Sequence, residues 1–180
     1  MPRTATATRL WASSRPWGGV VTLLERVSRQ HGDFLKRLSG SRPAVFAVAY
    51  WLNGRGNEMI IPPLKYAPSA ADAADYVDAG DLFCRSPRGM TRLVEVKHSR
   101  KWLARDFPYQ LMFVASVAQV ERRHGQVGAY FVVSLDYSRL GWIKPSTQVH
   151  WTLVEKRADN TGNVERNYAC PVDHVIFVDL

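Results

Sequence analysis

The sequence predicts a mixed α/β domain in which one central β-sheet is flanked by helices. Three observations predict it: an amphipathic helical pattern near the N-terminus, several apolar runs of strand length, and a second helical pattern that divides those runs into two sets. Helix, strands, helix and strands in that order are typical of a sheet covered by helices. The chain has 180 residues, enough for one domain with a substantial core.

We expect residues 1–16, which are basic and rich in Ser, Thr and Ala, to be a flexible arm ahead of a single domain over residues 17–180. The arm lacks the apolar run of an export signal. Cys84 and Cys170 form no CxxC pair, so neither a disulfide framework nor a structural zinc site is indicated. No segment approaches the roughly 20 apolar residues that cross a bilayer. These features predict a cytoplasmic protein without membrane insertion.

From Trp17 to Leu38 apolar residues recur at helical spacing, which predicts an amphipathic helix with Glu25 at the edge of its apolar face. The next segment, "RPAVFAVAYWLNGRGNEMIIPPL", contains an apolar run, a glycine-rich turn and a second, shorter run. Periodicity leaves helix and strand open for the first run, and predicts a strand for the second. Residues 66–80 follow as an acidic connector of small residues.

The segment "DLFCRSPRGMTRLVEVKH", which begins at Asp81, predicts a hairpin with a loop over residues 86–90. The residues flanking that loop then pair, and the same register sets Asp81 opposite Glu95. A longer loop would bring Asp75 or Asp78 to that position instead.

Two carboxylates in directly opposed positions need a compensating charge. Opposed residues have Cβ atoms about 4.5 to 5.5 Å apart, and like charges there are destabilising. Mg²⁺ takes oxygen ligands, commonly one or two carboxylates with water, so Asp81 and Glu95 are suitable donors, and the carbonyl of Val96 could complete the set. Strand alternation puts Lys97 on the same face as Glu95, where its ammonium could orient a water or stabilise developing negative charge.

The segment "SRKWLARDFPYQLMFVASVAQVERRHG" follows the hairpin and predicts a helix with Pro108 in its first turn and Gly125 just past its end. The residues expected on its buried face are Leu111, Val114, Ala115 and Ala118. Three later apolar runs predict strands at residues 129–135, 149–155 and 174–180.

The net charge of +8 favours a polyanionic partner such as nucleic acid. Arginine outnumbers lysine, which suits bidentate phosphate binding, although GC-rich coding would produce the same bias, and the two explanations carry equal weight. Arg100, Lys101 and Arg105 flank the hairpin and are candidates for phosphate contacts. Arg122 and Arg123 are instead interpreted as favourable charges at the C-terminus of a helix.

These residues resemble the PD-(D/E)xK nuclease superfamily, whose signature is an Asp at the start of one hairpin strand and Glu-x-Lys on the next. Here Asp81 is followed by thirteen residues and then by Glu95, Val96 and Lys97. The resemblance covers roughly residues 20–135. It implies a restriction-endonuclease-like αβββαβ core and hydrolysis of DNA phosphodiesters that depends on Mg²⁺, with Mn²⁺ as a substitute.

By the same resemblance, Asp81 and Glu95 are metal ligands and Lys97 orients the attacking water. Glu25 resembles the acidic residue that many members place on the first helix, although a solvated charge there is equally expected. Gln110 resembles the glutamine of a Gln-x-x-x-Tyr motif in the exonuclease branch, but Val114 occupies the tyrosine position. The length of the chain leans toward an endonuclease, and a homodimer stays open. The alternative function is a non-catalytic, basic nucleic-acid-binding module.

Overall fold

A computed structural model describes residues 32, 40–69, 72, 81–103, 106–157 and 164–180. The expected arm, the helix predicted from Trp17 to Leu38 apart from Gly32, and Glu25 lie outside these residues. So do Asp75, Asp78 and Arg105. Within the described ranges, no helix is both long enough and apolar enough to cross a membrane.

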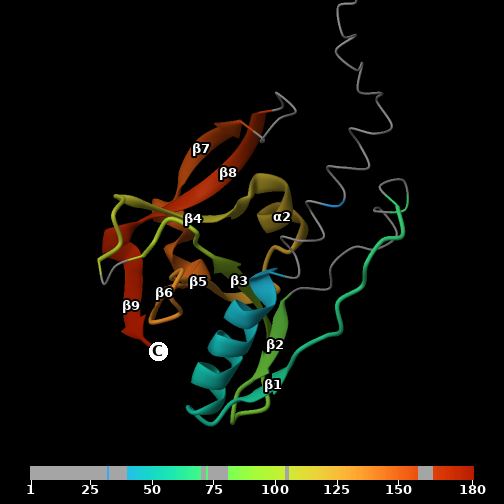
Figure 1. Ribbon diagram of the computed structural model, residues 1–180. Coiled ribbons are helices and arrows are strands. Elements are labelled where there is room, and N and C mark those ends of the chain that lie inside the picture. The colour runs from blue at the N-terminus through green and yellow to red at the C-terminus, as the bar shows by residue number, and fades with distance from the viewer. Residues whose placement is uncertain (1–31, 33–39, 70–71, 73–80, 104–105, 158–163) are drawn as a thin grey trace, which may run out of the picture.

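A six-stranded mixed sheet forms the centre of the molecule, with strand order β1-β2-β3-β5-β6-β9 (Figure 1). Its strands are β1 (Glu58–Ile60), β2 (Leu82–Arg85), β3 (Thr91–His98), β5 (Val127–Val133), β6 (Arg139–Ile143) and β9 (Val175–Asp179). Neighbouring strands are antiparallel except β3 and β5, which run parallel. A parallel pair needs a crossover connection, and the chain between β3 and β5 supplies it.

The first apolar run, for which the sequence left helix and strand open, is a helix over residues 40–53. It buries Ala44, Val45, Val48 and Ala49, the spacing of one helical face. These side chains pack on Val94 and other residues of one face of the large sheet. Figure 1 shows this helix in cyan beside β1 and β2. The second apolar run forms β1, as predicted.

The other face of the large sheet is covered by a second sheet that the sequence did not predict. Its three antiparallel strands, in the order β4-β8-β7, are β4 (Leu111–Ser116), β8 (Val164–Pro171) and β7 (Thr152–Arg157). Met112, Val114 and Cys170 from this sheet share a buried cluster with Val132 and Ile143 of the large sheet. The single central sheet expected from the sequence is therefore two packed sheets.

The helix predicted after the hairpin is wrong over its first half, because residues 111–116 form β4. The alternation of buried Met112, exposed Phe113 and buried Val114 is that of a strand. Two residues of the expected helical stripe, Leu111 and Ala118, are exposed. Pairing with β8 overrides local helix propensity, and β8 is too polar to be recognised from apolarity.

The helix that does follow is α2 (Val117–Arg122), and the sequence marks its start. Ser116 is the N-cap, and its Oγ accepts the backbone N–H of Gln119 at 3.3 Å. Ser-x-x-Gln is a capping-box pattern. Gly125 lies just past the end with a φ of 72°, as the prediction of a C-terminal glycine required.

The strands predicted after residue 125 are partly confirmed. β5 and β9 match the first and third predicted strands, whereas β7 begins only after a 3-10 helix, η2 (Pro145–His150). A second 3-10 helix, η3 (Val172–His174), leads into β9. β6 was missed because Gly141 interrupts its apolar pattern. That glycine leaves room for the buried Met112, since a Cβ there would lie 2.7 Å from the Met112 sulfur and the side chain would have to shift.

Replacing Leu82 by alanine should destabilise the fold strongly, because its side chain on β2 is fully buried in the cluster that the large sheet forms with the helix over residues 40–53. We expect a loss of about 2 to 5 kcal/mol in the free energy of unfolding, measured by urea denaturation. Leu103→Ala is the matched control, since Leu103 is 66% exposed and should change stability by less than about 0.5 kcal/mol. Equal losses of stability in the two variants would contradict this packing.

Candidate active site

The hairpin has the register that the sequence predicted. Arg85 pairs with Thr91, and the pairing continues to Leu82 opposite Val94. The loop over residues 86–90 closes with a 2.8 Å hydrogen bond from the N–H of Ser86 to the carbonyl of Met90. Continued by one residue, this register places Asp81 opposite Glu95. This register excludes the longer loop that would have brought Asp75 or Asp78 opposite Glu95.

Asp81 lies directly ahead of β2, and its carboxylate lies at the edge of β3. The N–H of Val96, beyond the last paired residue of β2, donates to Oδ2 of Asp81 at 2.6 Å. In an extended strand the N–H and C=O of one residue point to the same side. The carbonyl of Val96 therefore faces the same edge of β3 as the Asp81 carboxylate, as the predicted ligand set requires.

Glu95 projects from β3 toward α2 and is only 3% exposed. Its Oε2 accepts a 2.7 Å hydrogen bond from Nε2 of Gln119, and its Oε1 forms an ion pair with Nη1 of Arg123. The Arg123 side chain is itself only 8% exposed. Part of the charge compensation that the sequence analysis assigned to a divalent cation thus comes from the protein.

Gln119 and Arg123 reach Glu95 together because they lie one helical turn apart. The N–H of Arg123, the C-cap of α2, donates to the carbonyl of Gln119 at 3.2 Å. The sequence analysis missed both residues, and it interpreted Arg123 as a charge near a helix terminus rather than as a buried partner of Glu95. The usable signal was the capping box, since it fixes where α2 begins and places Gln119 and Arg123 on one face.

Tyr130 completes the buried cluster around Glu95, its lateral neighbour on β5. The side chain is 5% exposed and packs edge-on against Trp151, with ring centres 5.5 Å apart. Burial raises the pKa of Tyr130 above its usual value, against the opposing effect of the Arg123 cation. The phenol is therefore neutral at physiological pH, and Arg123 and Glu95 are the opposed charges of this cluster.

Lys97 lies two residues beyond Glu95 on the same face of β3 and is half-buried. Its Nζ is 5.8 Å from the centre of the Phe113 ring, a cation–π contact with β4. His98 turns to the opposite face and stacks on Tyr137 with ring centres 4.8 Å apart, as alternation predicts. Arg100 and Lys101 follow β3 directly and are both exposed.

Gln110 does not lie on a helix, contrary to the sequence analysis. It is exposed just ahead of β4, and its backbone carbonyl accepts the N–H of Val172 at 3.0 Å. The glutamine that contacts Glu95 is Gln119. The structure thus brings Asp81, Val96 and Glu95 together at one hairpin.

The donor set at this hairpin suits a hard divalent cation. It offers two carboxylates and a carbonyl, and Mg²⁺ is commonly held in proteins by one or two carboxylates with water as the remaining ligands. Zinc prefers nitrogen and sulfur ligands, so these oxygen donors suit Mg²⁺ better than zinc. Among the described residues, no group of three or more His, Cys, Asp or Glu side chains gathers as a metal cage.

Comparison of the chain with protein-family models, with curated proteins and with solved structures finds no match. A functional proposal must therefore rest on the geometry of the hairpin and of α2.

Arg123→Met should destabilise the protein, because it leaves the buried carboxylate of Glu95 without its cation. We expect a loss of about 3 to 5 kcal/mol in the free energy of unfolding, measured by urea denaturation. Adding Glu95→Gln to this variant should restore part of that stability, because a neutral amide no longer needs the cation. Additive losses of stability in the double variant would show that the two side chains do not interact.

Proposed function

We propose that this protein is a Mg²⁺-dependent DNA nuclease, most simply an endonuclease, that hydrolyses phosphodiester bonds. One observation carries the proposal: the Asp81 carboxylate is hydrogen-bonded to Val96, directly beside Glu95, with Lys97 next on the same face of β3. This is the arrangement that the PD-(D/E)xK signature implies for its two acidic ligands and its lysine.

The order of elements gives further support. The helix over residues 40–53 precedes the antiparallel strands β1, β2 and β3, and a crossover containing α2 leads to β5, parallel to β3. Helix, three antiparallel strands, helix and parallel strand is the order of a restriction-endonuclease-like αβββαβ core. The additional strands β4, β7 and β8 are then insertions and extensions around that core.

In the proposed mechanism Asp81, Glu95 and the carbonyl of Val96 hold the metal. When bound, Mg²⁺ would polarise the scissile phosphate and make an attacking water more acidic. The Lys97 ammonium carries a positive charge beside the two carboxylates, where it orients the water and stabilises charge that develops on the phosphate. Its contact with Phe113 limits the positions open to the long side chain.

Arg123 is compatible with this role for Glu95. A carboxylate offers about four lone-pair positions, and Gln119 and Arg123 account for one on each oxygen. The remaining positions on Glu95 can face Asp81. Arg123 keeps the buried Glu95 ionised, as a metal ligand must be, but its positive charge also weakens metal binding.

A second candidate is a non-catalytic nucleic-acid-binding module. The ion pair between Glu95 and Arg123 favours this function, because Arg123 neutralises Glu95 without any metal. The basic net charge and the exposed Arg100 and Lys101 would then serve binding alone.

Asp81→Asn and Lys97→Ala should each reduce Mg²⁺-dependent cleavage by about 100-fold or more, while DNA affinity changes little. The asparagine oxygen can still accept the Val96 N–H, so the hairpin is preserved. The assay uses labelled duplex, single-stranded and branched DNA with fragments resolved on gels. Lys144→Ala, which removes an exposed lysine stacked on Trp142, is the control for removal of a cation and should cleave normally.

The same panel separates the two candidate functions. Cleavage by the unaltered protein that needs Mg²⁺ or Mn²⁺ and is abolished in both variants supports the nuclease. Full cleavage by Asp81→Asn and Lys97→Ala would refute the proposed mechanism. DNA binding with no metal-dependent cleavage would assign the protein to the binding module.

Arg100→Ala and Lys101→Ala should weaken DNA binding and flatten its dependence on salt, because a protein with fewer phosphate contacts releases fewer counterions when it binds. For duplex DNA the slope of log K against log salt should fall by about 0.9 for each phosphate that a variant no longer neutralises. Fluorescence anisotropy at several salt concentrations measures this slope. An unchanged slope would show that neither residue contacts phosphate.

A further inference from the structure

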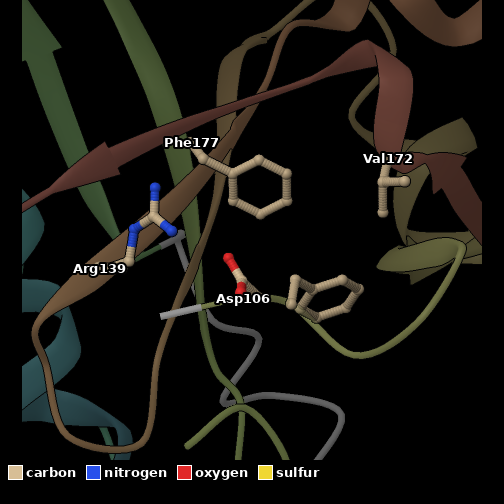
Figure 2. A pocket seen from close by; sticks show the side chains of 5 residues that line it. Asp106, Arg139, Val172 and Phe177 are labelled. Carbon is tan, nitrogen blue, oxygen red and sulfur yellow. The ribbon is translucent and has the colours of Figure 1, made fainter. Parts of the chain in front are cut away.

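A cavity of about 340 Å³ opens at the end of the large sheet, away from the carboxylates of the hairpin. It is lined by Asp106, Phe107, Arg139, Val172 and Phe177. Figure 2 shows the Asp106 side chain projecting toward the ring of Phe177, with Arg139 and Val172 on either side. None of these residues has a part in the proposed hydrolysis.

The aromatic wall of this cavity is rigidly supported. Phe107 and Phe177 lie with ring centres 6.2 Å apart, and both pack edge-on against Trp102, at 5.4 and 5.7 Å. Trp102 is completely buried, so it holds the two rings in place before any ligand arrives. A pre-organised apolar wall with a few polar groups is typical of a site for a planar ring.

The charges of the cavity disfavour an anionic ligand. The Nε of Arg139 lies 2.8 Å from Oδ1 of Asp179, so this carboxylate already balances the guanidinium. Asp106 then adds a second negative charge. The carboxylates would repel a phosphate. A cationic ligand would be repelled by the Arg139 guanidinium, whose Cζ lies 5.8 Å from the centre of the Phe177 ring. The polar groups therefore favour a neutral ring that offers N–H donors to Asp106.

We propose that the cavity binds an unpaired guanine base of a DNA strand. Guanine presents two adjacent N–H groups, at N1 and N2, that match the two oxygens of a carboxylate. The other DNA bases offer a single amino group or a single ring N–H on that edge. The base must be unpaired, because the edge that Asp106 recognises is the one used in base pairing.

The cavity and the hairpin lie on the same face of the large sheet, with the second sheet packed between them. Laterally paired residues lead across the sheet in one row: Lys97, Val132, Gly141 and Phe177. Lys97 and Phe177 therefore share a face, three inter-strand steps or about 14 Å apart. Because Val132 and Gly141 are buried beneath Met112 of β4, a DNA strand that reached both sites would pass around the second sheet and span more than the roughly four stacked nucleotides of the direct distance. The inference rests on the proposed function, because it takes DNA as the partner.

The test compares two short oligothymidines, one with a central guanine and one with a central inosine, whose base lacks the N2 amino group. Fluorescence anisotropy in EDTA measures binding without cleavage. The unaltered protein should bind the guanine oligonucleotide about fivefold or more tightly, the lower end of what a bidentate contact contributes. Asp106→Asn should abolish this preference. Asp173→Asn, an exposed carboxylate that does not line the cavity, should retain it.

Equal binding of the two oligonucleotides by the unaltered protein, or a preference that survives Asp106→Asn, would overturn the inference. Binding of a lysine- and arginine-rich peptide that Asp106→Asn abolishes, without any guanine preference, would assign the cavity to a cationic ligand and also overturn it. Guanine preference without metal-dependent cleavage would refute the nuclease and leave the base site intact. Metal-dependent cleavage without guanine preference would refute the base site and leave the nuclease proposal intact.

Discussion

The buried carboxylate of Glu95 is the constraint on which the rest of the structure depends. An ionised side chain that is 3% exposed needs charged and hydrogen-bonding partners, and α2 supplies them as Arg123 and Gln119. This ties the helix of the β3–β5 crossover to the middle of the large sheet. Because β4 runs directly into α2, the same contact positions the second sheet over the face that carries Glu95 and Lys97.

The two carboxylates at the hairpin have different environments, which suits them to different tasks. Asp81 is partly exposed and is oriented by the Val96 N–H at the edge of β3, whereas Glu95 is enclosed and charge-balanced by Arg123. A metal at this edge would contact the partly exposed carboxylate of Asp81 and the buried carboxylate of Glu95, which Gln119 and Arg123 hold in place. The exposed Arg100 and Lys101 follow at the end of β3. The row of residues that begins at Lys97 leads beneath the second sheet to the aromatic cavity at Phe177.

The hairpin could be predicted from the sequence because its information is local. Its turn residues, its strand alternation and the spacing from Asp81 to Glu95 all lie within one short segment, and the structure confirms the register. β4 could not be predicted, because the apolar residues from Leu111 to Ser116 fit the spacing of a helix as well as that of a strand. Its partner β8 is polar and far away in the sequence. The same error hid Arg123 and Gln119, because only a helix that starts at Ser116 and packs on β3 turns both of them toward Glu95. The pocket lined by Asp106 and Phe177 likewise depends on distant segments that meet only in the folded chain.

Direct measurement of metal binding tests the central claim, that the hairpin edge holds a divalent cation beside a carboxylate already paired with Arg123. Titration with Mn²⁺, followed by the decrease of the free-ion signal in electron paramagnetic resonance, counts the bound ions without any DNA. The account predicts a site in the unaltered protein that Mg²⁺ competes for and that Asp81→Asn weakens. A protein that binds no Mn²⁺ at millimolar concentration, or an Asp81→Asn variant that binds it unchanged, would contradict it.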